Sequence, residues 1–188
     1  EFVNTAKFLK DEFSVLGPRY LNVNPKSLVQ SNEAKDLGEI NVLSGACMFF
    51  KKEIFDLIGG FDENFFLYFE ENDFCLKAIK LKKIYQINKI KILHNAGNSV
   101  LLKNQEEIED QRNLRSWHFL WSNFYFYKKK YSFLLAIIIF IPIIIRTRIK
   151  IFYYSKKKKN QNLIKYVNRW EGMKSSIMGK KSFKRSNF

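Results

Sequence analysis

The sequence lacks the features that mark several common protein classes. It has two cysteines, Cys47 and Cys75, whose spacing suggests neither a metal site nor a disulfide framework. We expect two buried free thiols in a reducing cytoplasm, with a pairing of the two as the alternative. It shows no secretory signal peptide and no internal repeat. The segment Glu1–Lys10 has the composition of the middle of a helix without a preceding cap. We therefore expect the chain to begin inside a larger domain.

Acidic residues are nearly absent from the C-terminal third. Residues 128–188 hold 17 Lys and Arg against one acid, Glu171, whereas residues 1–127 hold 16 Lys and Arg against 17 Asp and Glu. The net charge of +15 therefore belongs to the C-terminal end of the chain. A near-neutral body argues against nucleic acid as the partner, although the total charge alone would suggest it.

The sequence also lacks an apolar run long enough for a simple membrane span. Phe133–Ile145 is apolar throughout but has only thirteen residues, including Pro142. As a helix it would measure about 20 Å, against a hydrocarbon core of about 30 Å. Basic residues flank it on both sides, which favours a segment lying in the interface of an anionic membrane. A buried core helix and a tilted span over Tyr131–Tyr154 are the alternatives.

These patterns divide the chain into three predicted segments. Residues 1–127 form the globular part, 128–159 a membrane-associated hydrophobic segment with basic flanks, and 160–188 a basic amphipathic helix that gives way to a loose tail at Ser182.

The globular part alternates between helix-like and strand-like stretches. Helices are predicted at 1–12, 51–58, 70–83 and 106–130, and strands at 14–22, 40–50 and 84–93. Gly59-Gly60 should end the second of these helices. Such an alternation predicts an α/β fold with a mostly parallel sheet.

The chemically most promising segment is Gly59–Asp73, with the sequence GGFDENFFLYFEEND. It crowds acids among aromatic side chains, and desolvation and mutual repulsion both raise a carboxyl pKa. A raised pKa suits a general base that takes a proton from a hydroxyl group. The alternative is a set of ordinary helix-start acids beside core aromatics. The acids are Asp62, Glu63, Glu70, Glu71 and Asp73.

Three motifs in order resemble family 2 glycosyltransferases of the rhamnosyltransferase-like, cell-surface polysaccharide type. They are Ser44-Gly45-Ala46, the block GGFDENFFLYFEENDF, and a strand ending at His94 that is followed by Asn-Ala-Gly-Asn-Ser. The later stretch RSWHFLWSNFYFYKKKY resembles the aromatic, basic helix of such proteins. The resemblance covers about Ser14 to Tyr131.

The resemblance implies the C-terminal half of a GT-A (nucleotide-diphospho-sugar transferase) fold. The implied reaction transfers a sugar from a nucleotide-sugar donor to a hydroxyl of a lipid-linked glycan acceptor. Glu71 stands where the family usually has its catalytic Asp, so we rank Glu71 first as the base, then Asp73, then Glu70. The implied acceptor-binding residues are Gly45, Asp62, Glu63, Phe66 and Tyr68.

The chain contains no Asp-x-Asp motif, which in such enzymes holds the donor through a divalent cation. We expect Mn²⁺ or Mg²⁺ to be held mainly by an acidic motif upstream of this chain. The resemblance lets His94 complete the metal site, with a structural histidine as the alternative. Arg115 is placed to meet the donor diphosphate, or else faces solvent. His118 is assigned to packing.

The expected location is the cytoplasmic face of the plasma membrane, as a peripheral or monotopic protein. There an anionic membrane surface would present the lipid-linked acceptor. The alternative function is a basic membrane-surface or nucleic-acid-binding protein without catalysis.

Overall fold

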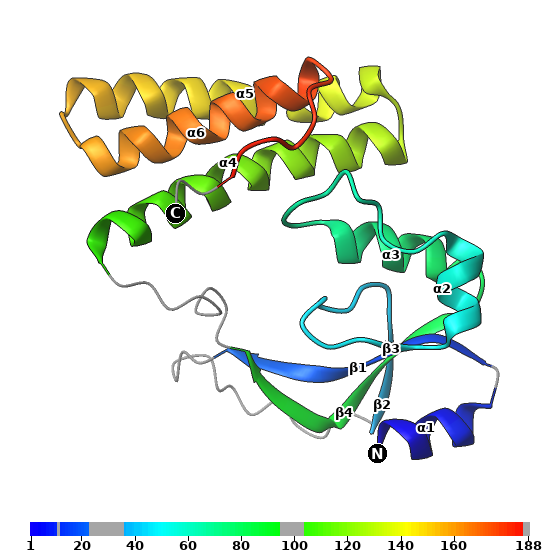
Figure 1. Cartoon of the computed structure of the whole chain (residues 1–188). Helices are drawn as coiled ribbons and strands as arrows, with labels where there is room; N and C mark the ends of the chain where they lie inside the picture. The colour runs from blue at the N-terminus through cyan, green and yellow to red at the C-terminus, as the bar shows by residue number, and fades with distance from the viewer. Residues whose placement is uncertain (11, 23–35, 95–103, 186–188) are drawn as a thin grey trace. The chain divides into compact units, whose positions relative to one another are not determined.

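The computed structural model describes residues 1–10, 12–22, 36–94 and 104–185 (Figure 1). The chain forms two compact units. Unit 1 comprises Glu1–Asp62 and Glu70–Leu101, and unit 2 comprises Glu63–Phe69 and Leu102–Phe188. The two units are defined by packing contacts. The division into the three segments 1–127, 128–159 and 160–188 is based on charge and motifs and stays a prediction.

Unit 1 is built on a four-stranded sheet with the order β2-β4-β1-β3. Its central strands β1 and β4 are parallel, and both outer pairings are antiparallel. The sheet is thus mixed, and the expectation of a mostly parallel sheet holds only for the central pair. The elements of unit 1 are α1 (Phe2–Leu9), β1 (Phe13–Asn22), β2 (Leu37–Ile40), β3 (Phe49–Phe50), α2 (Lys52–Ile58), α3 (Glu70–Ala78) and β4 (Lys83–His94).

The predicted strand over 40–50 is wrong. Leu37–Ile40 pairs with β4, whereas only Phe49 and Phe50 pair with β1. The residues between them make a turn at Ser44–Cys47, where the small side chains of Gly45 and Ala46 allow the chain to bend. The segment therefore crosses from one edge of the sheet to the other instead of forming one strand.

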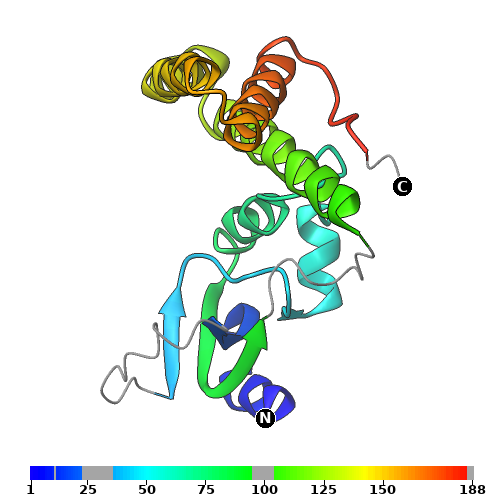
Figure 2. The same ribbon diagram turned by 90° about the vertical axis from the view of Figure 1, so that its left-hand side faces the viewer.

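Both faces of the sheet in unit 1 are covered by helices. Val15 and Ile84 pack with Phe74 and Ala78 of α3 in one core cluster, and Leu16 and Ile87 pack with α1 in another. Figures 1 and 2 show α2 and α3 on one side of the sheet and α1 on the other. Neighbouring side chains of β1 thus point to opposite faces of the sheet and pack in different core clusters, as the pleat of a strand requires.

The helix α2 ends where its glycines predict. Gly59 adopts a left-handed conformation (φ 74°) and its amide donates to the Asp56 carbonyl. Gly60 has φ 67°, and a Cβ there would lie 2.8 Å from the Phe55 ring. Only glycine satisfies both the backbone angle and the close approach. By contrast, α3 ends at Ala78, earlier than the predicted Lys83, because the next amides return to the carbonyls of Lys77 and Ala78 in a turn.

Unit 2 is a three-helix arrangement of α4 (Gln105–Lys130), α5 (Phe133–Lys156) and α6 (Asn160–Ile177). Its core joins Leu120 and Phe124 of α4, Ala136 and Phe140 of α5, and Met173 of α6. The helix α5 continues well beyond the thirteen-residue apolar run and includes Pro142. No helix within the described residues is long and apolar enough to cross a membrane.

The tail after α6 is held against α4 as far as Arg185. Trp121 Nε1 donates to the Lys180 carbonyl (3.0 Å), and His118 Nε2 donates to the Lys184 carbonyl (2.8 Å). Ser182 donates to His118 Nδ1 (3.0 Å). The prediction of a loose tail from Ser182 is therefore wrong for residues 182–185. The assignment of His118 to packing is confirmed, because its side chain is fully buried.

The closest approach of α4 and α6 occurs at Gly172. A Cβ on this residue would lie 2.1 Å from the Trp117 carbonyl oxygen, a distance that real atoms do not tolerate. Glycine is thus required by the contact between two helices, although no backbone angle demands it.

We expect Gly172→Ala to lower the free energy of unfolding of unit 2 by about 1–3 kcal/mol, because the helices must separate to admit the methyl group. Chemical denaturation followed by tryptophan fluorescence measures this directly, since Trp117, Trp121 and Trp170 all lie in unit 2. Lys174→Ala, on the exposed side of α6, is the control and should change stability by less than about 0.5 kcal/mol. Equal stability of the two variants would contradict the close-contact assignment.

Candidate functional site

The block Gly59–Asp73 contributes to both compact units. Gly59–Asp62 and the acids from Glu70 onward belong to unit 1, whereas Glu63–Phe69 belongs to unit 2.

The acids of the block form the first turn of α3, where the helix dipole favours negative charge. Their environments differ. Asp73 is buried and makes a salt bridge with Lys77 one turn later, with 3.1 Å between Nζ and Oδ2. Glu70 and Glu71 each have a buried Oε2 atom without a hydrogen-bond partner among the described residues. An unpaired buried carboxyl oxygen is costly, and such atoms recur where a ligand completes the hydrogen bonding.

The carboxyl of Glu71 has a perturbed pKa. Burial raises its pKa above the ordinary value, the neighbouring Glu70 adds to the rise, and the amide of Glu71 itself opposes it. The carboxyl therefore takes up a proton more readily than a solvated one does. A rise in this direction favours a general base.

Gly45 adjoins Glu71. A Cβ at Gly45 would lie 3.4 Å from the Glu71 Cβ, so Gly45 packs beside the stem of the Glu71 side chain. Gly45 is itself exposed, in the turn that follows the buried Leu43. The structure thus brings together two of the predicted site residues, from segments far apart in the sequence, and it does so within unit 1.

The aromatic part of the block packs on α4 in unit 2. The Leu67 carbonyl accepts a hydrogen bond from the buried Ser122 Oγ (2.7 Å). Tyr68 and Phe69 have φ values of 68° and 70°, and their rings pack on Phe119. Left-handed backbone at two bulky residues costs on the order of 1–3 kcal/mol each, so the surrounding contacts must hold this conformation in place.

Phe66 is the exposed aromatic of this segment, with 42% of its surface accessible. Its ring lies 4.9 Å from that of His118, and the Arg185 guanidinium lies 3.9 Å from its centroid. Burial and the nearby cations of Arg185 and Lys184 lower the pKa of His118, although the hydrogen bond to the Lys184 carbonyl opposes this. Phe66 thus presents a ring at the surface that a cation and an imidazole hold in position.

The remaining predicted site residues are divided between the two units. Asp62 is half-buried in unit 1, and Glu63 is exposed in unit 2. Arg115 donates to Gln111 of the same helix (2.8 Å). His94 is the last residue of β4, and its side chain lies outside the described part of the structure. Among the described residues, no three His, Cys, Asp or Glu side chains cluster as metal ligands would.

A region of 102 residues is 28% identical to the low-salt glycan biosynthesis hexosyltransferase Agl10 of Haloferax volcanii, and covers 44% of this chain. The match spans 33% of that relative, about a third of its length. No profile of a known protein family matches the chain. No solved structure matches it either. The similarity to a hexosyltransferase supports a role in glycosyl transfer.

Two features of these sites escape the sequence analysis. The left-handed backbone of Tyr68 and Phe69 carries no sequence signal, because bulky residues normally avoid it. The contact of Arg185 with Phe66 joins residues far apart in the chain, and the basic tail gives no hint of it. The salt bridge from Asp73 to Lys77 is different, because its spacing of four residues within a predicted helix is visible in the sequence.

The raised pKa of Glu71 predicts a pH-dependent stability. A carboxyl whose pKa is higher in the folded state stabilises the fold below its unfolded pKa, and this contribution is lost as the pH rises through the folded value. Glu71→Gln cannot ionise, so it should gain stability relative to the parent protein as the pH rises above about 4.5. Denaturation midpoints measured between pH 4 and pH 8 test this.

Glu53→Gln, at an exposed position in the first turn of α2, provides the matched control and should show no such pH-dependent gain. A stability difference between Glu71→Gln and the parent that stays constant over this pH range would contradict the assignment of a strained, buried carboxyl.

Proposed function

We propose that the chain forms the acceptor side of a glycosyltransferase of family 2, rhamnosyltransferase-like, with a GT-A fold. The enzyme would transfer a sugar from a nucleotide-sugar donor to a hydroxyl of a lipid-linked glycan acceptor in cell-surface polysaccharide synthesis. The similarity to a glycan biosynthesis hexosyltransferase supports the reaction class. The observation that carries the proposal is Glu71, a half-buried side chain whose Oε2 atom is buried without a hydrogen-bond partner among the described residues and which lies beside Gly45.

In the proposed reaction, Glu71 removes the proton from the acceptor hydroxyl. The oxygen then forms a bond to the anomeric carbon of the donor sugar, and the bond from that carbon to the diphosphate breaks. The nucleoside diphosphate departs with the bonding electron pair. A base of this kind contributes about 10²–10⁴-fold to the rate. Asp73 is less suited to the role because Lys77 already engages it.

A Mn²⁺ or Mg²⁺ ion, when bound, would neutralise the charge that develops on the departing diphosphate. The described residues contain no cluster of three candidate ligands. On the resemblance, we propose that an acidic motif upstream of this chain mainly holds the ion, with His94 as one further ligand.

We expect Glu71→Gln to reduce kcat by about 10²–10⁴-fold, because the amide cannot accept the proton. Asp73→Asn should reduce kcat less, and its effect should come with a loss of stability from the broken contact to Lys77. Both are measured by sugar transfer in the full-length protein that includes the expected donor-binding half. Near-normal turnover of Glu71→Gln would overturn the assignment of the base.

We also propose that α5 rests on the cytoplasmic face of the plasma membrane, where a lipid-linked acceptor would be presented. One face of α5 packs into unit 2 through Ala136 and Phe140. The opposite face exposes apolar side chains along most of the helix, and Lys150, Lys156 and Lys157 lie over aromatic rings near its end. An apolar stripe bordered by cations suits an anionic interface. The exposed apolar residues are Phe133, Leu134, Leu135, Ile138, Ile139, Ile141, Ile145, Ile149, Phe152 and Tyr153.

Replacing Ile138, Ile145 and Ile149 together by Gln should weaken binding to vesicles of mixed neutral and anionic lipids by roughly 100-fold. Each of these side chains is more than half exposed, so the fold should tolerate the change. The matched control replaces Val3, Leu57 and Leu81, which are exposed apolar residues of unit 1, and should bind as the parent does. Equal loss in both triple variants, or none in either, would rule out α5 as the docking face.

A further inference from the structure

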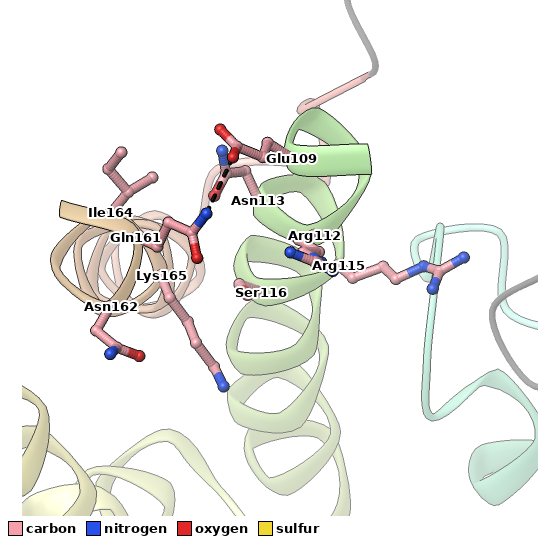
Figure 3. Close-up of a pocket in the computed structure, with 9 residues that line it drawn as sticks. All are labelled: Glu109, Arg112, Asn113, Arg115, Ser116, Gln161, Asn162, Ile164 and Lys165. Carbon is pink, nitrogen blue, oxygen red and sulfur yellow. Dashed lines mark hydrogen bonds between the residues drawn. The ribbon is translucent and has the colours of Figure 1, made fainter. Parts of the chain in front are cut away.

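A groove of about 400 Å³ lies between α4 and α6 within unit 2 (Figure 3). The α4 side includes Arg112, Asn113 and Ser116, and the α6 side includes Asn162 and Lys165. Its volume lies within the range of pockets that bind small molecules or their polar groups. Neither the proposed base nor the apolar face of α5 belongs to it.

The groove arises from the way the two helices run. Gln161 near the start of α6 donates to Glu109 in the second turn of α4 (3.1 Å), and Gly172 further along α6 touches Trp117 further along α4. The two helices therefore run in the same direction and come closest at Gly172. The groove lies on the N-terminal side of that contact on both helices, where their side chains do not fill the space between them.

The charge of the groove is predominantly positive. Its lining includes Arg112, Arg115 and Lys165 against the single acid Glu109, and Figure 3 shows the Arg115 side chain extending away from α6. The Glu109 carboxylate already accepts hydrogen bonds from Gln105 and Gln161.

Two of these cations are available for a ligand. Neither Arg112 nor Lys165 makes a hydrogen bond or an ion pair within the described residues, and Figure 3 shows Lys165 extending from α6 toward α4. Arg115 differs, because Gln111 engages it. Arg112 and Lys165 line the same groove, so their like charges repel each other, and a bound anion would reduce that repulsion.

We propose that this groove binds a phosphate or diphosphate group. Arg112 would contact two phosphate oxygens with its planar guanidinium, and Lys165 would add a point charge from the opposite helix. Asn113, Ser116 and Asn162 provide side-chain donors for the remaining oxygens. The basic run Lys156–Lys159 ends directly before α6 and strengthens the positive field at this end of unit 2. The same chemistry is present in a nucleoside diphosphate and in an isoprenoid lipid phosphate.

Calorimetric titration of the whole chain with inorganic pyrophosphate tests the site without requiring any transfer activity. We expect one binding event, and the double variant Arg112→Gln/Lys165→Gln should weaken it by about tenfold or more, since each contact to a charged group is lost. The control Lys174→Gln/Lys181→Gln removes the same charge from exposed positions outside the groove and should weaken binding by less than about threefold. Equal weakening in both variants, or no binding to the parent chain, would overturn the proposal.

Amide chemical shifts provide a second measurement that does not depend on any variant. Pyrophosphate should perturb the amides of 112–116 and 161–165 more than those of Lys128–Lys130, a basic run at the other end of α4. The strongest perturbation at Lys128–Lys130 instead would contradict the groove. Repeating the titration with a nucleoside diphosphate and with a short-chain isoprenyl phosphate identifies the source, because the natural ligand should bind more tightly than pyrophosphate.

The outcome is distinguishable from failure of the proposed function. Loss of transfer in Glu71→Gln with unchanged pyrophosphate binding supports both ideas. Pyrophosphate binding to the groove in a full-length protein that shows no transfer activity would support the anion site and contradict the proposed transferase function.

Discussion

The parallel pairing of β1 with β4 is the interaction on which unit 1 depends. β1 is paired along both of its edges and buried on both of its faces, since Val15 serves the core under α3 and Leu16 the core over α1. Ser14 Oγ reinforces the pair by donating to the carbonyls of Lys82 and Lys83, at 2.8 and 3.1 Å. Parallel strands need a long crossover between them, and α2 and α3 lie in that crossover. The position of Glu71 thus follows from a strand pairing in which Glu71 takes no part.

Two helices and the two central strands are the parts of the fold that the sequence predicts well. The predicted bounds of α2, α4, β1 and β4 agree with the structure to within a residue or two, because glycine stops, charge at helix ends and apolar alternation are local signals. The helix predicted at 70–83 ends at Ala78 instead. The segment from Ile40 to Phe50 carries an apolar signal as well, yet most of it is a turn. Apolar content shows that a segment is buried, but the pairing of Leu37–Ile40 with one edge strand and of Phe49–Phe50 with another is a tertiary outcome. The chain turns at Ser44–Cys47 because the segments on either side of it pair with different strands, β4 and β1.

For the candidate site too, the sequence predicts the local motif but not the contacts between distant segments. The acids of α3 can be recognised in the sequence as a motif. Their ranking as candidate bases rests on the family resemblance. The structure adds that Asp73 forms a salt bridge with Lys77. Glu71 instead lies beside Gly45, and its buried Oε2 has no hydrogen-bond partner among the described residues. That distinction comes from distances between segments that are remote in sequence, which no local pattern encodes. The groove between α4 and α6 is likewise invisible to the sequence, because Arg112 and Lys165 occupy unremarkable polar positions on two separate helices.

The placement of Glu63–Phe69 in unit 2 has a consequence for the growing chain. These residues leave the ribosome well before the α4 side chains on which they pack, including Tyr125 and Phe126. At about 5–20 residues per second, roughly 3 to 11 s pass between the two events. For that interval the aromatic side chains of this segment lack the helix on which they pack. This is the kind of surface that chaperones recognise, so unit 2 can close only after synthesis has moved well past the segment that it recruits.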